Sequence, residues 1–374
     1  MKEPIRILHV VPNMQQGGLE NLIMNIYRNI DRTKVQFDFL VHYKKEFFFD
    51  KEIEKLGGKI YRFSVREDNN FIKYYKDLCD FFKEHSGEYR VVHGHMASLA
   101  FIYLRIAKKY NISVRIIHSH GTSHLKNIKG YLKYFTFKMA DKYATDRFAC
   151  STEAGKYLFG AKNFKIINNA IDMDKFKYNE SLRKTKRNEL QLEDKFVIGH
   201  IGRFNLQKNH KYLIKIFSNI VKKNHNARLL LIGIGEELEN IKDFVRKLNI
   251  SDYVFFLGQR NDVCELYQAM DVFCMPSKFE GLPLTGIEAQ VSGLPCVFSN
   301  QITREVKISN NCIFLPLDED TKKWEECVET VNNKIINRLS EYQKMKETNY
   351  NIKILSKNVE GLYLDFHYKN EERV

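Results

Sequence analysis

The sequence predicts an α/β protein made of two doubly wound domains, each a parallel sheet with helices on both faces. Short apolar runs alternate with segments whose apolar residues recur at helical spacing, first over residues 5–171 and again over residues 196–300. Alternation of this kind favours parallel strands joined by crossover helices. The chain has 374 residues, more than one ordinary hydrophobic core accommodates, so two domains are expected.

In the first half, each strand is predicted from a short apolar run and each helix from apolar residues three or four positions apart. The expected strands are 5–11, 35–42, 59–63, 89–95, 114–120, 147–151 and 165–171. The expected helices are 19–30, 51–57, 74–85, 97–110 and 131–144. Glycines after the first expected strand and at positions 57 and 58 mark the turns.

The second half repeats this order of strand and helix. The expected strands are 196–202, 227–235, 253–258, 272–276 and 294–300. The expected helices are 210–223, 238–250, 263–271 and one that opens after Pro283 and ends at Gly293. Residues 172–190 are rich in charged residues and show little periodic spacing of apolar residues, so the interdomain connection is expected near 170–195. The predicted boundaries are 1–172 and 173–348, followed by a C-terminal helix in 349–374 that packs back towards the first domain.

Net charge is +14, and almost all of it lies in the first half. Residues 1–170 hold 29 Lys and Arg against 17 Asp and Glu, a net +12, and the remainder is nearly balanced. A basic half favours an anionic partner such as a phosphorylated substrate or a membrane surface.

Cysteine usage and hydropathy predict a reduced, cytoplasmic protein. The seven cysteines form no CxxC pair, which argues against structural zinc and against a disulfide framework. No run approaches the roughly 20 apolar residues that a spanning helix needs. The N-terminal segment has an acid at Glu3 and a proline at Pro12 and is interpreted as a first strand, not a signal peptide.

Charged residues follow two expected strands of the second half. Arg203 and Lys208 lie in the segment GRFNLQKNH after the strand 196–202. A forked guanidinium and a flexible ammonium on one loop suit a diphosphate.

After the strand 272–276 comes KFEGLPLTGIEAQ, in which a turn leads into a helix. The amides of Leu284 and Thr285 begin that helix and could bind phosphate. Glu280 and Glu288 stand on either side of the turn, where carboxylates accept hydrogen bonds from sugar hydroxyls. The pattern therefore predicts a site for a nucleoside diphosphate sugar.

These motifs resemble the retaining glycosyltransferases of the two-Rossmann (GT-B) type, family 4, and especially the branch that makes bacterial capsular and exopolysaccharides. Besides EGLPLTGIE, the segments VVPNMQQGGLENL, VVHGHMASLA, IIHSHGTS, CSTEAGKYLFG and NNAID look like that branch, in order and nearly throughout the chain. The resemblance implies two Rossmann-like domains facing a central cleft. It also implies metal-independent transfer of a hexose or N-acetylhexosamine, with no cofactor and usually a uridine nucleotide.

The resemblance assigns roles to particular residues. It implies that Arg203 and Lys208 neutralise the leaving diphosphate, that Glu288 holds the ribose and that Glu280 holds the donor sugar. Leu284 and Thr285 would contribute amides to the phosphates, and Gly17 and Gly18 would bring a backbone loop close to the donor. His120 matches a histidine near the reacting carbon. His118 is the alternative for that role, and His93 and His95 are interpreted as hydrogen-bonded core residues.

The chain departs from the family pattern at two positions. Ala170 and Pro283 stand where the family commonly has glycine, and Pro283 lacks one N–H that could face a phosphate. Neither change touches the charged set. The D-x-D spacing of Asp172 and Asp174 lies in the expected connection and is not taken as a metal site. Gly233-Ile234-Gly235 lacks the third glycine of a dinucleotide fingerprint.

Residues 124–142 combine five lysines with aromatic residues on an expected helix. A basic amphipathic helix of this kind suits an anionic membrane surface. The resemblance implies that the first domain takes the acceptor, a growing polysaccharide or a lipid-linked oligosaccharide. The expected location is therefore the cytoplasm, with peripheral contact at the inner face of the cell membrane as one possibility.

Two other classes of function remain open from the sequence alone. A sugar-nucleotide epimerase of the same architecture would need further acid–base carboxylates and would turn over donor without an acceptor. A catalytically silent partner subunit would not need Arg203, Lys208 and both glutamates. A nucleic-acid binder is not expected, because the chain carries no motif of that class.

Overall fold

A computed structural model of the protein describes all residues except 1–2, 86, 97–98, 122–127, 333–336 and 369–374. The chain forms two compact units. The first contains residues 1–170 together with 352–374, and the second contains residues 171–351.

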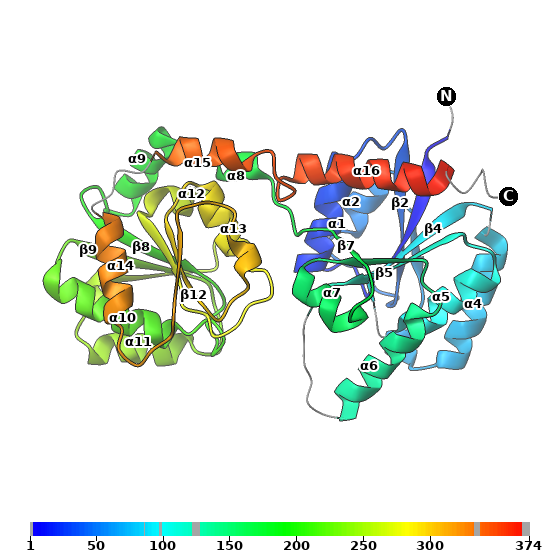
Figure 1. Ribbon diagram of the computed structural model, residues 1–374, viewed down its shortest axis with the longest axis horizontal. Coiled ribbons are helices and arrows are strands. Elements are labelled where there is room, and N and C mark those ends of the chain that lie inside the picture. Colours follow the sequence, from blue (N-terminus) through cyan, green and yellow to red (C-terminus); the bar gives the residue numbers. More distant parts are fainter. Residues whose placement is uncertain (1–2, 86, 97–98, 122–127, 333–336, 369–374) are drawn as a thin grey trace. The chain divides into compact units, whose positions relative to one another are not determined.

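The first unit is built on a seven-stranded parallel sheet of order β3-β2-β1-β4-β5-β6-β7 (Figure 1). Its strands are β1 (Ile5–Val10), β2 (Val35–Val41), β3 (Ile60–Arg62), β4 (Tyr89–Gly94), β5 (Val114–Ser119), β6 (Asp146–Ala149) and β7 (Lys165–Ile166). The chain order reverses between β1 and β4, as in a doubly wound sheet, and such a reversal is where these folds bind ligands.

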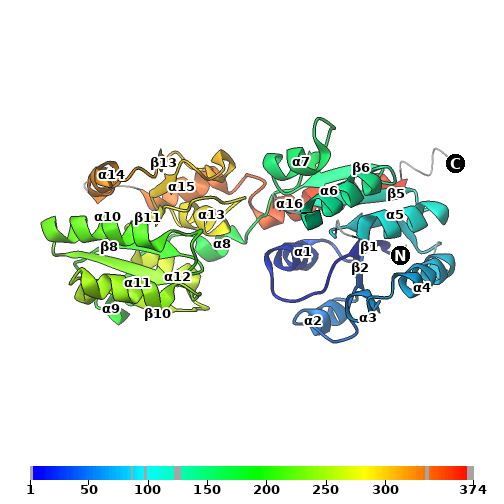
Figure 2. The same cartoon turned by 90° about the horizontal axis from the view of Figure 1, so that it is seen from below.

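Helices cover both faces of this sheet. They are α1 (Gly18–Asn29), α2 (Asp50–Lys55), α3 (Val65–Asp68), α4 (Phe71–His85), α5 (Ala100–Lys109), α6 (Ile128–Asp141), α7 (Thr152–Phe159) and the C-terminal α16 (Ile352–Tyr368). In β1, Ile7 packs into one buried cluster with α1 and α16, and the next residue, Leu8, packs into a second cluster with α4 and α5 (Figure 1 and Figure 2). Neighbouring residues of a strand thus face two cores, which explains why these strands are apolar at most positions and do not alternate between apolar and polar residues.

The second unit repeats the plan with a six-stranded parallel sheet of order β10-β9-β8-β11-β12-β13. Its strands are β8 (Phe196–Ile201), β9 (Ala227–Ile232), β10 (Val254–Gly258), β11 (Val272–Met275), β12 (Cys296–Ser299) and β13 (Cys312–Leu315). Here the reversal of chain order lies between β8 and β11.

The helices of the second unit form two layers. They are α8 (Met173–Phe176), α9 (Glu180–Glu189), α10 (His210–Lys223), α11 (Leu238–Lys247), α12 (Val263–Ala269), α13 (Leu284–Val291), α14 (Lys322–Asn332) and α15 (Arg338–Met345), with short 3-10 helices at Ser251–Tyr253 and Arg304–Val306. Helices α10, α11 and α14 contribute to one buried cluster, and α8, α12, α13 and α15 to the other.

Residues 172–190, interpreted from the sequence as an unpatterned connection, contain the helices α8 and α9. Helix α9 belongs to the second unit and buries charged side chains. Lys186 lies 3.0 Å from Asp262 and 2.9 Å from Glu265 in ion pairs, and Arg187 donates to the Ala269 carbonyl at 2.8 Å. A helix docked through buried cations has no apolar stripe, which is why periodicity missed it.

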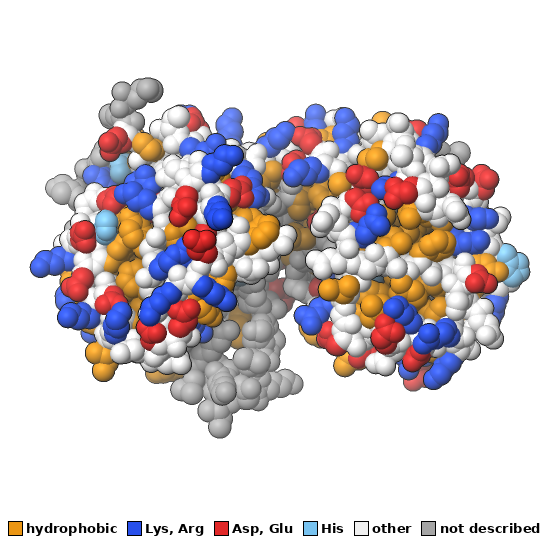
Figure 3. Space-filling model, turned by 180° about the vertical axis from the view of Figure 1, so that it is seen from behind, with side chains coloured by type: hydrophobic (Ala, Val, Ile, Leu, Met, Phe, Trp, Pro, Cys, Tyr) orange, Lys and Arg blue, Asp and Glu red, His pale blue; other side chains and the backbone are white. Residues whose placement is uncertain are grey.

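The predicted membrane contact concerns the surface charge of the first unit and the exposure of residues 124–142. On the face seen in Figure 3, basic and acidic side chains are interspersed on both units. Within 124–142, residues 124–127 and the side chains of 128–134 lie outside the described residues, Phe135 is exposed and Phe137 is buried. Among the described residues, no helix is long and apolar enough to cross a membrane.

Candidate sugar-nucleotide site

The predicted donor residues of the second unit gather at the carboxyl ends of β8 and β11, where the chain order reverses. Arg203 stands two residues after β8, and Lys208 lies in the loop that leads to α10. Glu280 lies in the loop after β11, and Glu288 lies on α13. The sheet therefore brings loops separated by some seventy residues of sequence to one edge.

Lys208 and Glu280 form a largely buried ion pair. Nζ of Lys208 is 2.7 Å from Oε1 of Glu280, and the two side chains are only 15% and 9% exposed. Apart from this ion pair, Oε1 of Glu280 has no hydrogen-bond donor among the described residues. Because a carboxylate oxygen has more than one acceptor site, it can accept a further hydrogen bond while it is paired with Lys208.

Gln207 ties the two loops together. Its side-chain amide donates to the Phe279 carbonyl at 2.9 Å and to Oε2 of Glu280 at 3.1 Å. The backbone carbonyl of Gln207 accepts a hydrogen bond of 2.8 Å from the backbone amide of Lys278. These contacts fix the position of Glu280 relative to Lys208.

Helix α13 begins at Leu284, with Pro283 in extended conformation as its N-cap. The structure gives the amides of Leu284 and Thr285 no backbone acceptor among the described residues, whereas the amides of Gly286 and Ile287 bond to the Pro283 carbonyl. Two free amides at a helix N-terminus present partial positive charge suited to a phosphate.

Glu288 lies in the second turn of α13. Its Oε2 accepts a hydrogen bond of 2.9 Å from the hydroxyl of Tyr267, which lies 3.0 Å from the Thr285 carbonyl as well. Burial raises the pKa of the Glu288 carboxyl, and the Tyr267 hydroxyl acts against that rise. Oε1 has no donor in the described part of the chain, so the carboxyl can still accept from a ligand hydroxyl.

The glycines of Gly233-Ile234-Gly235 have a packing role at this edge. A side chain at Gly233 would lie 2.1 Å from the Gly202 carbonyl oxygen, and one at Gly235 would lie 2.3 Å from the Phe204 carbonyl oxygen. Gly233 also has a φ of +140°, a conformation that side chains disfavour. Because both residues are glycine, the loop after β9 can pack on the loop that carries Arg203.

Arg203 is far more exposed than Lys208 and Glu280. Its side chain is 70% exposed, and its Nε donates to Glu236 at 3.1 Å. This ion pair lies at the surface and holds the guanidinium only weakly, so Arg203 is free to turn towards a ligand.

The remaining predicted residues lie in the first unit, at the carboxyl ends of β1 and β5. Gly17 is the extended N-cap of α1, and Gly18 is its first residue. His120 follows β5 and is partly exposed, whereas His118 is buried. Of the two histidines, His120 is therefore the more exposed.

His93 and His95 are buried and hydrogen-bonded, but their partners were not foreseen. Nδ1 of His95 lies 2.9 Å from Nε2 of His120, and Nε2 of His93 lies 3.0 Å from Nδ1 of His118. Sequence reasoning also missed Gln207 and Tyr267. Each is a single polar residue without a motif, and only the pairing of loops and helices brings it to a glutamate.

The fold and site together define a class. Two Rossmann-type units, the second with cations, helix amides and carboxylates at its switch point, are the GT-B arrangement. Solved structures agree on the fold: Anabaena HepE in complex with UDP and glucose aligns with a TM-score of 0.75 at 17% identity, covering 96% of this chain and 99% of that one. The lipopolysaccharide outer core galactosyltransferase WaaB aligns at 0.70 and 17% identity over 98% and 99%.

Sequence comparison identifies the family. The model for glycosyl transferases group 1 matches residues 183–351. The chain is 34% identical over 333 residues to the putative glycosyltransferase EpsF of Bacillus subtilis, covering 86% of each. It is 27% identical over 315 residues to an Escherichia coli UDP-Gal:alpha-D-GlcNAc-diphosphoundecaprenol alpha-1,3-galactosyltransferase, covering 79% of this chain and 81% of the relative. The chain belongs to the group 1 glycosyltransferases.

Proposed function

We propose that the protein transfers a hexose or N-acetylhexosamine from a uridine diphosphate sugar to a growing surface polysaccharide, retaining the anomeric configuration and using no metal in the transfer. Relatives support the substrate class: the Escherichia coli enzyme acts with a UDP-sugar on a lipid diphosphate acceptor, as its name states. A Staphylococcus aureus relative, 28% identical over 284 residues, is a capsular polysaccharide biosynthesis glycosyltransferase.

The observation that carries the proposal is Glu280. A carboxylate oxygen has more than one acceptor site, so an oxygen paired with a cation can still accept a hydrogen bond. Oε1 of Glu280 lies 2.7 Å from the Lys208 ammonium and has no other donor among the described residues. A sugar hydroxyl would supply a further hydrogen bond while the attached diphosphate meets the cation.

The other groups divide the donor between them. Lys208, Arg203 and the free amides of Leu284 and Thr285 stabilise the negative charge that grows on the diphosphate as the sugar bond breaks. Glu288, with one oxygen held by Tyr267, accepts hydrogen bonds from the ribose hydroxyls.

The first unit takes the acceptor. His120 is the exposed end of its histidine cluster and acts near the reacting carbon, with Gly17 and Gly18 giving the donor a close approach to backbone. The acceptor hydroxyl attacks from the face that the leaving diphosphate occupies, and the diphosphate assists in removing its proton. A lipid-linked acceptor places this unit at the inner face of the membrane, where residues 124–142 make contact.

The test combines donor binding with product stereochemistry. Thermal unfolding is followed with UDP, UDP-sugars and guanosine or thymidine diphosphate sugars, for the wild type and for Glu288→Ala. The proposal expects stabilisation by uridine nucleotides that the variant lacks. Transfer to a lipid diphosphate oligosaccharide is then followed by proton NMR, and an inverted anomeric centre would refute the proposed stereochemistry.

A further inference from the structure

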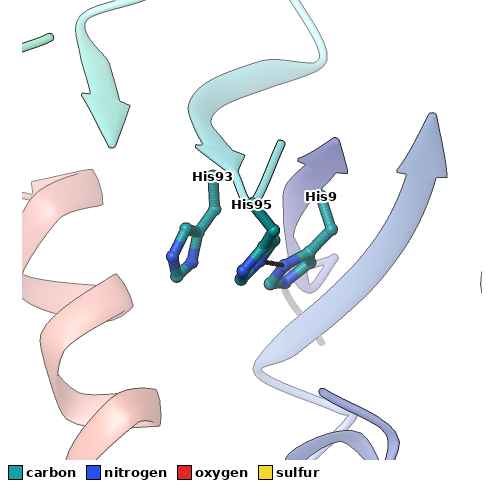
Figure 4. A group of neighbouring side chains, drawn as sticks. All are labelled: His9, His93 and His95. Carbon is teal, nitrogen blue, oxygen red and sulfur yellow. Dashed lines mark hydrogen bonds between the residues drawn. The ribbon is translucent and has the colours of Figure 1, made fainter. Parts of the chain in front are cut away.

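The first unit holds a cluster of five histidines, of which the proposed transfer involves only His120. They come from the carboxyl ends of three adjacent strands and are His9, His93, His95, His118 and His120. Figure 4 shows His9, His93 and His95 side by side, with a hydrogen bond between His9 and His95. The rings of His93 and His95 stack with centroids 4.1 Å apart.

Two hydrogen-bonded chains run through the cluster. In the first, Nδ1 of His9 lies 2.9 Å from Nε2 of His95, whose Nδ1 lies 2.9 Å from Nε2 of His120. In the second, the Tyr363 hydroxyl lies 2.6 Å from Nδ1 of His93, whose Nε2 lies 3.0 Å from Nδ1 of His118.

Nε2 of His118 ends the second chain without a partner. The side chain is 2% exposed, and this nitrogen has no hydrogen-bond partner among the described residues. Ring nitrogens of His95, His118 and His120 lie within 4.8 Å of one another, and His120 is the member that is partly exposed. A buried, unpaired imidazole nitrogen beside two others is the composition of a metal site with a path for entry.

We propose that this cluster binds a divalent transition-metal ion of the zinc class through Nδ1 of His95, Nε2 of His118 and Nε2 of His120. Three neutral imidazoles suit such an ion, and they leave a fourth position for water. His9, His93 and His95 form a second group of three possible ligands, but all three are buried. In the proposed arrangement, His9 and His93 are hydrogen-bonded to the ligands His95 and His118.

Metal binding would replace the 2.9 Å contact between Nδ1 of His95 and Nε2 of His120, and the remaining hydrogen bonds fit the roles of ligands and supporting groups. With its Nδ1 on the metal, His95 carries its proton on Nε2 and donates it to His9. With its Nε2 on the metal, His118 carries its proton on Nδ1 and donates it to His93, which in turn donates from Nδ1 to the oxygen of Tyr363. A metal-bound histidine usually donates its other N–H to such a partner, which fixes the tautomer and the ring orientation.

Occupancy has a consequence that rests on the proposed function. The metal takes the lone pair of Nε2 of His120, the histidine placed near the reacting carbon. Bound metal therefore inhibits transfer while leaving donor binding in the second unit unchanged. The ion is an inhibitor at this site and not a participant in the chemistry.

The test begins with binding, without any substrate. The full-length protein is treated with chelator and titrated with Co²⁺, and a tetrahedral nitrogen and oxygen site gives visible absorption without thiolate charge transfer in the near ultraviolet. Zn²⁺ is expected to displace the Co²⁺ at one ion per chain. His118→Asn and His120→Asn each remove one ligand and are expected to weaken binding by a factor on the order of 100 or more, beyond the 10–100-fold typical of a lost supporting group.

His210→Asn is the matched control. His210 is also a buried imidazole, in edge-on contact with His200, but it belongs to no group of three possible ligands among the described residues. Tyr363→Phe removes the acceptor of His93 and should weaken Co²⁺ binding about 10-fold.

The outcomes separate the metal site from the proposed function. Wild-type protein without the tetrahedral spectrum overturns the metal site whatever the variants do, and so does a spectrum that survives in His118→Asn. If Co²⁺ binds as expected but Zn²⁺ does not slow transfer, the site stands and the role given to His120 falls. Absence of transfer with any donor would refute the proposed function and leave the binding result intact.

Discussion

Replacing Lys208 by methionine tests the ion pair on which the donor site depends. Lys208→Met keeps most of the aliphatic stem and removes the charge 2.7 Å from Oε1 of Glu280. At the effective dielectric constant of about 20 that suits protein sites, a pair at this separation has a Coulomb energy of about 6 kcal/mol, of which desolvation offsets a large part. Breaking a buried pair by removing one partner typically costs about 3–5 kcal/mol.

The double variant Lys208→Met/Glu280→Gln separates stability from binding. It leaves no buried charge unpaired, and the amide at position 280 can still contact Gln207, so we expect the stability of the second unit to return to within about 1 kcal/mol of the wild type. Donor binding should not return, because the cation that meets the diphosphate is still absent.

The assay is urea unfolding of the wild type, both single variants and the double variant, together with calorimetric titration of UDP. Glu280→Gln alone should destabilise less than Lys208→Met, since the ammonium left behind is the more exposed partner. If Lys208→Met unfolds at the same urea concentration as the wild type, or if the double variant recovers UDP binding, the coupling inferred from the geometry is wrong.

Three further predictions follow from single contacts. Tyr267→Phe removes the donor to Glu288 and should raise the pKa of that carboxyl further and weaken UDP binding by about 1 kcal/mol or more; unchanged calorimetric affinity would contradict this. Burial lowers the pKa of His42 to about 4, so the folded protein favours the neutral imidazole. The contribution of His42 to the free energy of unfolding is complete above its unfolded pKa of about 6.5 and is lost as the pH falls towards 4. At pH 5 the free energy of unfolding should be lower by about 2 kcal/mol from this residue. In urea unfolding at pH 7 and pH 5, His42→Gln should show a smaller difference than the wild type. Gly233→Ala would place a methyl group 2.1 Å from the Gly202 carbonyl oxygen and should lower the free energy of unfolding by about 2 kcal/mol or more; a variant as stable as the wild type would disprove the tight packing of these loops.

The sheets could be predicted from the sequence because a strand buried on both faces is apolar at most positions. β1, β2 and β8 show this despite polar residues such as Arg6, Asp38 and His200, and their predicted bounds differ from those observed by one residue. Strand β13 was not predicted, and of its residues Ile313 is exposed and Phe314 and Leu315 are only partly buried. Helix α9 was not predicted either, because it packs through buried cations and has no apolar stripe.

The candidate site was predictable where charge and spacing carried the signal. Lys208 and Glu280 lie in loops that follow parallel strands, Glu288 lies on the helix after the second of these loops, and the structure brings them to one edge of the sheet. The partners that orient them were not predictable, because Gln207 and Tyr267 reach the glutamates only through tertiary packing. The histidine chains depend on the pairing of β4 with β1 and β5, which no local pattern contains.

The assignment of α16 to the first unit has a consequence for how the protein is made. Leu355, Val359 and Tyr363 are buried in the same core as β1 and α1, yet the ribosome adds them only after all of the second unit has been synthesised. The second unit can therefore complete its core while the first still lacks a helix. Tyr363 also completes a histidine chain through His93, so in a nascent or C-terminally truncated chain the second unit can be folded while the first unit lacks both a helix and the end of this hydrogen-bonded chain.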